Sequence, residues 1–392
     1  MFPTISHLVN YVFGTDFSWP VPTFGFFVTL AFILSYLTFK SEFKRKEELK
    51  EMKPYEERER WNITAKLTLV VGYGFLGFLV GFKVVGALLD LDTFFYNPLR
   101  FIFSGQGNLR LGLLFAFMLC AFIIFANRKP LFSKTKKETI RLVSPQKLLP
   151  IMLLWSGIAG FIGAKLFNIF EDGSLHHSHT LFEILDFSGL TFWGGLIFGA
   201  FSYLFIGIRR GIYWKYLVDV GSLGMLVAYG VGRMGCHLSG DGDWGMVNTA
   251  EKPFRWLPDW MWSFRFPNNV LGQGEQIPGC VGKYCYVLPE GVFPTSFYEA
   301  TIILLAFGLL WNMRRKIKVP GLLFAIYLFI AGAERILIEC IRINYKFDIG
   351  GIYLSEAQLV GFFMAFLGFV VGGYLIFENR RLLKKSLTSK KI

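Results

Sequence analysis

Nine segments of the chain are made almost entirely of apolar residues, and most approach the roughly 20 residues that a helix needs to cross a bilayer. They are Val21–Thr38, Ala65–Leu89, Leu111–Ala126, Leu148–Phe170, Gly189–Ile208, Leu217–Gly232, Phe297–Trp311, Pro320–Cys340 and Ala357–Phe377. Polar stretches separate them. The pattern predicts an all-α fold: a polytopic transmembrane bundle of about nine spans, with residues 1–392 forming a single integral membrane domain.

The polar stretches between these segments alternate in charge along the chain. Most of the lysine and arginine lies in every second connection, namely Lys40–Arg60, Arg128–Lys147, Arg209–Lys215, Arg314–Lys318 and Arg380–Lys391. Short cytoplasmic loops are enriched in Lys and Arg. We therefore expect the N-terminus outside and the C-terminus in the cytoplasm, as an odd number of spans requires.

The composition agrees with a membrane protein and adds information on partners and cysteines. The formal net charge is +13, but the basic residues form short clusters between apolar segments, so we expect the lipid bilayer and no nucleic acid as a partner. The long polar loop 246–293 is expected to be extracytoplasmic and contains Cys280 and Cys285. Outside the cell these two could form a local disulfide, or they could remain free thiols.

Two arginines, Arg233 and Arg335, interrupt otherwise apolar segments. A charge at the bilayer centre costs a few kcal/mol on insertion scales, so such residues usually face a cavity or a partner. One interpretation is that each arginine grips an anion, since guanidinium can bind phosphate through two parallel hydrogen bonds. The other is that each pairs with a carboxylate, Glu334 or Glu339, and locks two helices together.

The surroundings of Arg233 favour a ligand site. The segment Gly230–Gly245 reads GVGRMGCHLSGDGDWG, and its glycines allow the backbone to leave helical geometry and approach a ligand closely. Irregular backbone at membrane depth is tolerated where it lines a cavity or is buried in protein. The same segment supplies a dense set of polar side chains: Cys236, His237, Ser239, Asp241 and Asp243.

Two further motifs carry candidate chemistry. Arg335, Glu339 and Arg342 are four and three residues apart, so they share one helical face, on which Glu339 could orient an arginine. In TFWGGLIFGA, Gly194 and Gly195 stand at an expected helix start. Small residues there permit close helix packing, or they leave backbone N–H groups near a bound anion.

Together these motifs resemble the prolipoprotein diacylglyceryl transferase family of bacterial inner membranes. Gly232–Gly245 is similar to the family signature, with Arg233 on its essential arginine and Asp241 in place of its glutamate. Cys236, His237 and Ser239 replace the signature's Asn, Phe and Asn. PTSFYEA, with Tyr298 and Glu299, resembles a Tyr-Glu segment of the family, and RILIECIR resembles its Arg-x-x-x-Glu-x-x-Arg helix. TFWGGLIFG departs from the pattern by placing Trp193 where the family has histidine.

The resemblance implies a multi-pass enzyme of the bacterial inner membrane. Such an enzyme moves the diacylglyceryl group of phosphatidylglycerol to the lipobox cysteine of a prolipoprotein signal peptide, and glycerol 1-phosphate leaves. It implies no cofactor and no metal, and we expect a monomer. Catalytic roles are expected for Arg233, Arg335, Glu339 and His237. Substrate contacts are expected for Arg233, Arg335, Trp193, Gly194, Gly195, Cys236, Ser239, Asp241, Tyr298, Glu299 and Arg342. Family members have seven spans, so residues 65–126 are expected to be an inserted helical hairpin.

The departures leave the proton acceptor open. His237 follows Arg233 by four residues and could replace the missing histidine, or no dedicated base is needed because a thiol is partly ionised at neutral pH. Two other functions also remain open. One is a non-catalytic paralogue that binds phospholipid, and the other is a transporter that uses the arginines for an organic anion.

Overall fold

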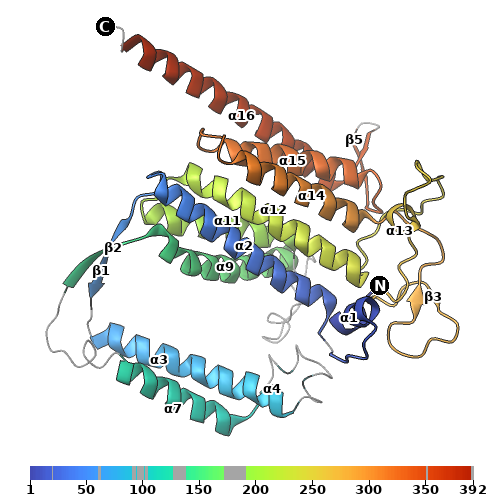
Figure 1. Cartoon of the computed structure of the whole chain (residues 1–392), viewed down its shortest axis with the longest axis horizontal. Helices are drawn as coiled ribbons and strands as arrows, with labels where there is room; N and C mark the ends of the chain where they lie inside the picture. Colours follow the sequence, from blue (N-terminus) through green and yellow to red (C-terminus); the bar gives the residue numbers. More distant parts are fainter. Residues whose placement is uncertain are drawn as a thin grey trace. The chain divides into compact units, whose positions relative to one another are not determined.

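The computed structural model describes residues 1–19, 21–60, 63–90, 105–126, 138–171, 191–349 and 352–389, together with Phe94 and Phe101. Over these residues the chain is mostly helical, and its strands form three two-stranded antiparallel ribbons, β1–β2, β3–β4 and β5–β6. The chain divides into two compact units, one of Met1–Met52 with Ile212–Ile392 and one of Lys53–Gly211. The all-α fold is confirmed (Figure 1).

The first unit is built on a packed series of long helices. α2 (Thr23–Glu48) packs on α12 (Trp214–Ser239), α12 packs on α14 (Thr295–Met313), and α15 (Leu322–Glu339) packs on α16 (Glu356–Ser389) (Figure 1). Fully buried Leu223 and Leu226 of α12 meet Ile303 and Leu310 of α14 in the core. This apolar packing aligns the helices that carry the candidate site.

Two buried carboxylates, Asp219 and Glu42, join helices of the first unit. Asp219 of α12 accepts the backbone N–H groups of Gly321 (2.8 Å) and Phe324 (3.1 Å), and so satisfies the start of α15. Glu42 of α2 is fully buried and pairs with Arg314 at 2.8 Å and with Arg45 at 2.7 Å. These contacts fix α2 to the end of α14 and α12 to the start of α15.

The remaining parts of the first unit are shorter. They are α1 (Ile5–Phe13), α13 (Asp259–Trp262), β3 (Glu275–Gln276), β4 (Tyr286–Val287), β5 (Phe347–Ile349) and β6 (Ile352–Leu354). The loop 246–293 contains α13 and the β3–β4 ribbon. Cys280 and Cys285 form a disulfide in this loop, which decides between the two alternatives that the sequence left open. That the loop is extracytoplasmic stays a prediction.

The second unit contains two helical hairpins. One runs through α3 (Ile63–Leu79), the π-helical turn η1 (Val80–Val85), α4 (Gly86–Leu89) and α7 (Leu109–Ala126). The ribbon of β1 (Tyr55–Arg60) and β2 (Glu138–Val143) joins the chain before this hairpin to the chain after it. The other hairpin comprises the 3₁₀ turn η2 (Pro145–Leu148), α9 (Leu149–Glu171) and α11 (Phe192–Arg209). The origin of the first hairpin as an insertion stays a prediction.

Eight helices within the described residues are long and apolar enough to cross a membrane, and they fall on eight of the nine predicted spans. The remaining predicted span, Pro320–Cys340, forms α15, which has 18 residues. It lies outside that set because its 18 residues include three charged ones, Glu334, Arg335 and Glu339. The outside location of the N-terminus stays a prediction.

Glycines let α9 and α11 approach to backbone contact. A Cβ on Gly194 would lie 2.2 Å from the carbonyl oxygen of Gly163, and one on Gly163 would lie 2.4 Å from that of Gly194. A Cβ on Gly195 would meet only ordinary contacts, the nearest at 3.5 Å. The packing interpretation of the TFWGG motif therefore accounts for Gly194.

We predict that Gly194→Ala lowers the stability of the protein in detergent, because the new methyl group must displace a backbone carbonyl. Overpacking of this kind costs ~1–3 kcal/mol. Gly157→Ala in α9 is the matched control, since its Cβ would meet nothing within 4 Å. Thermal unfolding of both variants checks the prediction, and equal midpoints would contradict it.

Candidate functional site

The site begins with Arg233 near the C-terminal end of α12, whose side chain is only 15% exposed. Its Nε lies 2.6 Å from Oε2 of Glu299, and its NH1 donates to Asp243. The guanidinium carbon also lies 5.3 Å from the ring centroid of Tyr229, one helical turn earlier, in a cation–π contact. Arg233 is therefore held on three sides.

Glu299 of α14 is the common partner of three arginines. Its side chain is fully buried, and besides Arg233 it contacts NH1 of Arg335 at 3.4 Å and NH1 of Arg342 at 3.2 Å. Arg335 belongs to α15, and Arg342 follows just after that helix ends. One carboxylate thus ties α12, α14 and α15 together and directs three guanidinium groups toward one place.

A short loop after α12 adds the second carboxylate. Gly240, with φ of 68°, ends α12 in the left-handed conformation, and Gly242 (φ 98°) turns the chain again. Asp243 then pairs with NH2 of Arg342 at 2.6 Å, while its carbonyl accepts the hydroxyl of Thr295 at 2.8 Å. Burial alone would raise the pKa of Asp243, but Arg233 and then Arg342 outweigh it and lower that pKa.

The cluster is close to neutral rather than strongly basic. Its arginines, Arg233, Arg335 and Arg342, are opposed by Asp243, Glu299 and Glu339, the last at 3.6 Å from Arg335. Glu339 does pair with Arg335, but both belong to α15, so this pair does not lock two helices together. The carboxylates that join different elements are Glu299 and Asp243. Glu334 forms no ion pair within the described residues, and its buried Oε1 has no hydrogen-bond partner there.

Cys236 and Asp241 adjoin the cluster. Ligand atoms of Cys236, Asp241 and Asp243 lie within 4.8 Å of one another, an arrangement of donors that a metal ion could use. The set does not favour a cation, because Asp243 is already neutralised by two arginines. Fully buried Ser239 donates to the carbonyl of Cys236 at 3.2 Å and so stabilises the end of α12.

His237 lies among aromatic rings. Trp260, Phe264, Phe266 and Phe297 surround it, with ring centroids 5.4–6.2 Å away. Its side chain is buried, and its Nδ1 has no hydrogen-bond partner among the described residues. Among the described residues no carboxylate hydrogen-bonds the His237 imidazole, so proton acceptance by His237 stays a prediction.

The remaining candidate residues take no part in the ion pairs of the arginine cluster. The Tyr298 hydroxyl donates to the carbonyl of Met261 at 2.6 Å and so ties α13 to the first turn of α14. Trp193, Gly194 and Gly195 lie at the start of α11 in the second unit, where Trp193 contacts the ring of Phe192. Their participation in the arginine site stays a prediction.

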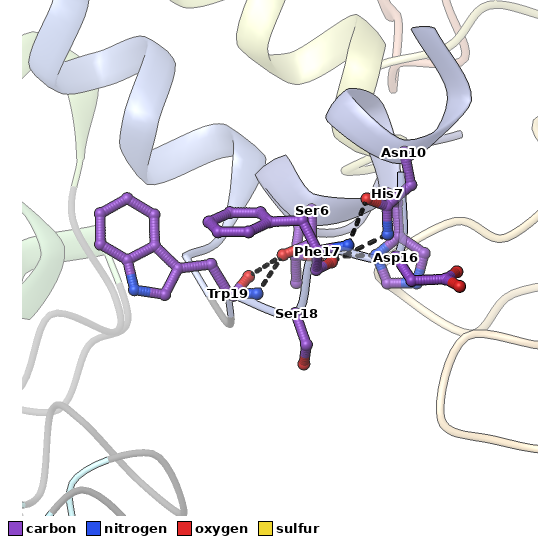
Figure 2. Close-up of a pocket in the computed structure, with 8 residues that line it drawn as sticks. Ser6, His7, Asn10, Asp16, Phe17, Ser18 and Trp19 are labelled. Carbon is purple, nitrogen blue, oxygen red and sulfur yellow. Dashed lines mark hydrogen bonds between the residues drawn. The ribbon is translucent and has the colours of Figure 1, made fainter. Parts of the chain in front are cut away.

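A second hollow lies at the N-terminal segment, apart from the arginine cluster. Figure 2 shows its lining by α1 and the following loop, and its volume is about 430 Å³. Ser6 and Asn10 hydrogen-bond the backbone of Trp19 and Phe17, so these polar groups hold the loop against α1. The hollow contains none of the residues that the motifs predicted.

Comparison with known proteins decides the family. Residues 111–374 match the family described as prolipoprotein diacylglyceryl transferase, and every candidate residue lies in this range. The chain belongs to this family. The sequence resemblance is thereby confirmed.

Individual relatives agree with this assignment. The chain is 31% identical over 216 residues to a phosphatidylglycerol–prolipoprotein diacylglyceryl transferase of Symbiobacterium thermophilum, covering 54% of this chain and 71% of the relative. A protein of the same name from Dehalococcoides mccartyi is 28% identical over 206 residues, with coverage of 52% and 67%. One from Streptococcus sanguinis is 24% identical over 253 residues, with coverage of 63% and 85%.

We predict that Glu299→Gln destabilises the protein severely, because three partly buried guanidinium groups would lose their common anion. Removing one member of a buried ion pair costs about 3–5 kcal/mol. Glu290→Gln, at an exposed position of the adjacent loop, is the control and should have no effect. The yield of monodisperse protein and its thermal midpoint measure the difference, and a stable Glu299→Gln protein would refute the role of Glu299.

Proposed function

We propose that this protein transfers the diacylglyceryl group of phosphatidylglycerol to the lipobox cysteine thiol of prolipoproteins, with release of glycerol 1-phosphate. It is a transferase of lipoprotein maturation, as its family membership supports. The observation that carries the proposal is the convergence of Arg233, Arg335 and Arg342 on Glu299. Three guanidinium groups held together at the end of membrane helices suit a phospholipid phosphate.

The arginines would act mainly on the transition state. As the bond between the glyceryl carbon and the phosphate oxygen breaks, the phosphodiester anion becomes a phosphomonoester and gains negative charge. Donors already fixed in position stabilise that added charge without reorganising. Arg233 and Arg335 are held in this way by buried carboxylates.

The arginines are already paired with carboxylates, so a lipid phosphate must replace one of these carboxylates to bind them. Asp243 is the most accessible of the carboxylates, with its side chain 28% exposed while those of Glu299 and Glu339 are fully buried. We therefore assign the exchange to Asp243: phosphate replaces this carboxylate on Arg233 and Arg342, while Glu299 keeps the frame in place.

The proposal also names the partners, the membrane and the oligomeric state. The partners are phosphatidylglycerol, prolipoprotein signal peptides and the bilayer of the bacterial inner membrane, and the protein acts as a monomer. The chemistry as written requires no cofactor and no metal, because the thiol, the lipid and charged side chains supply every reacting group.

One departure from the family favours a second candidate. Trp193 stands where the family has histidine, so the chain could be a non-catalytic paralogue that binds phosphatidylglycerol. The two candidates differ in one measurement. A binding protein retains the lipid but forms no thioether, and Trp193→His could then create activity.

Purified protein incubated with phosphatidylglycerol and a lipobox peptide should give a peptide carrying thioether-linked diacylglycerol, detected by mass spectrometry. Arg233→Lys keeps the positive charge but loses the planar guanidinium group that can donate two parallel hydrogen bonds to phosphate. The rate should therefore fall ~100-fold or more, as it does when an oxyanion-hole donor is removed. Arg255→Gln, at an exposed loop position, is the control. Absence of product with the unmodified protein, when lipid and peptide both bind, would disprove catalysis.

A further inference from the structure

Asp241 differs from the other carboxylates around the arginines. Asp243, Glu299 and Glu339 each pair with an arginine, whereas Asp241 forms no ion pair with Lys or Arg within the described residues. Its Oδ1 is buried and has no hydrogen-bond partner there. A buried carboxylate oxygen without a donor is costly, and such atoms often mark a functional requirement. Asp241 therefore has an acceptor position that the folded chain does not use.

The backbone holds Asp241 beside the arginines. Gly240 and Gly242 flank it in left-handed conformations, with φ of 68° and 98°, and so set the direction of this turn. Its carboxylate lies within 4.8 Å of both the Cys236 thiol and the Asp243 carboxylate, and Asp243 is bound to Arg233. A phosphate on Arg233 would therefore lie close to Asp241.

The charged and titratable groups around Asp241 tune it for proton transfer. Burial raises its pKa above the ordinary value and the Asp243 carboxylate raises it further. Hydrogen bonds with the Cys236 thiol and the Asp243 backbone N–H, together with the charge of Arg233, lower the pKa without cancelling the rise. A more basic carboxylate is a better proton acceptor for a thiol. Asp241 as a whole is partly exposed although Oδ1 itself is buried, so a substrate can approach the carboxylate from its exposed side.

Other side chains fit this role less well. His237 is enclosed by aromatic rings. Glu334 also has an unpartnered oxygen, but it lies within α15 and is only 4% exposed. Asp241 alone among these combines an unused acceptor, access and a place beside Arg233.

We propose that Asp241 is the general base that activates the lipobox thiol, an inference that rests on the proposed transferase function. The Asp241 carboxylate takes the proton from the thiol as the sulfur forms its bond to the glyceryl carbon. The bond from that carbon to the phosphate oxygen breaks, and its electron pair leaves with glycerol 1-phosphate on the arginines. The proton then passes from Asp241 to solvent, which restores the carboxylate.

The test is the pH dependence of transfer by Asp241→Asn. A free thiol has a pKa of about 8.5 and is only a few per cent thiolate at neutral pH, so loss of the base should reduce the rate ~30-fold near pH 7. The deficit should shrink to within about 3-fold above pH 9, where the substrate ionises without help. In the unmodified protein, activity should fall on acidification as Asp241 is protonated, at a pH above that for an ordinary aspartate.

Asp259→Asn is the matched control, because Asp259 is an exposed aspartate at the start of α13 whose side chain is 84% accessible. Its pH profile should match that of the unmodified protein. Asp241→Glu keeps a carboxylate and should retain most of the rate near neutral pH. Asp241→Ser provides a second removal of the carboxylate if the Asn variant does not fold, and retained phosphatidylglycerol binding shows that the site is intact.

A selenocysteine lipobox peptide separates base loss from structural damage. Its selenol is already ionised at neutral pH, so Asp241→Asn or Asp241→Ser should transfer to it at the rate of the unmodified protein. A deficit that persists with selenocysteine and at high pH would overturn the inference, as would an unchanged pH profile in the variant. Failure of the unmodified protein to form any product would instead disprove the transferase function itself.

Discussion

The candidate site depends on the burial of Glu299 among three arginines. A lone charge in this environment would cost several kcal/mol, and its cost is recovered only when the opposite charges are in place with good geometry. Arg233, Arg335 and Arg342 come from α12, α15 and the chain just beyond α15, whereas Glu299 comes from α14. If these helices packed in another arrangement, buried charges would be left without partners. Ion pairing therefore restricts how the helices can pack.

Contacts far from the cluster support the same arrangement. Asp219 satisfies backbone N–H groups at the start of α15, and Glu42 holds Arg314 at the end of α14. α14 and α15 are each fixed at both ends, one end by these carboxylates and the other by the arginine cluster. A phosphate-binding site needs such rigidity, because donors that are already oriented stabilise new charge without further cost.

The residues that depart from the family signature lie together at the C-terminal end of α12. His237 has joined an aromatic cluster with the loop 246–293, while Cys236 lies beside Asp241 and next to the arginines. Arg233, Arg335, Glu299 and Glu339 stand at positions that match the family's motifs, whereas Cys236, His237 and Ser239 do not.

Much about this protein was determined by the sequence alone. Long apolar segments in a bilayer form helices, because each backbone N–H and C=O group needs a hydrogen-bond partner and no water is present to provide one. The cost of buried charge identified Arg233 and Arg335, and helical spacing placed Glu339 next to Arg335. The roles of Asp219 and Glu42 cannot be predicted from the sequence, because a single acidic residue in or beside a span does not reveal its partner.

Only the tertiary structure decided how these charges are paired. Glu299 is far from Arg233 in the chain, and by sequence spacing Glu334 is an equally suitable partner for the arginines. The direction in which each helix faces selects among such carboxylates, and that direction follows from packing across the whole bundle. The same holds for Asp241, whose unused oxygen results from the turns at Gly240 and Gly242 and from the pairing of its neighbours elsewhere.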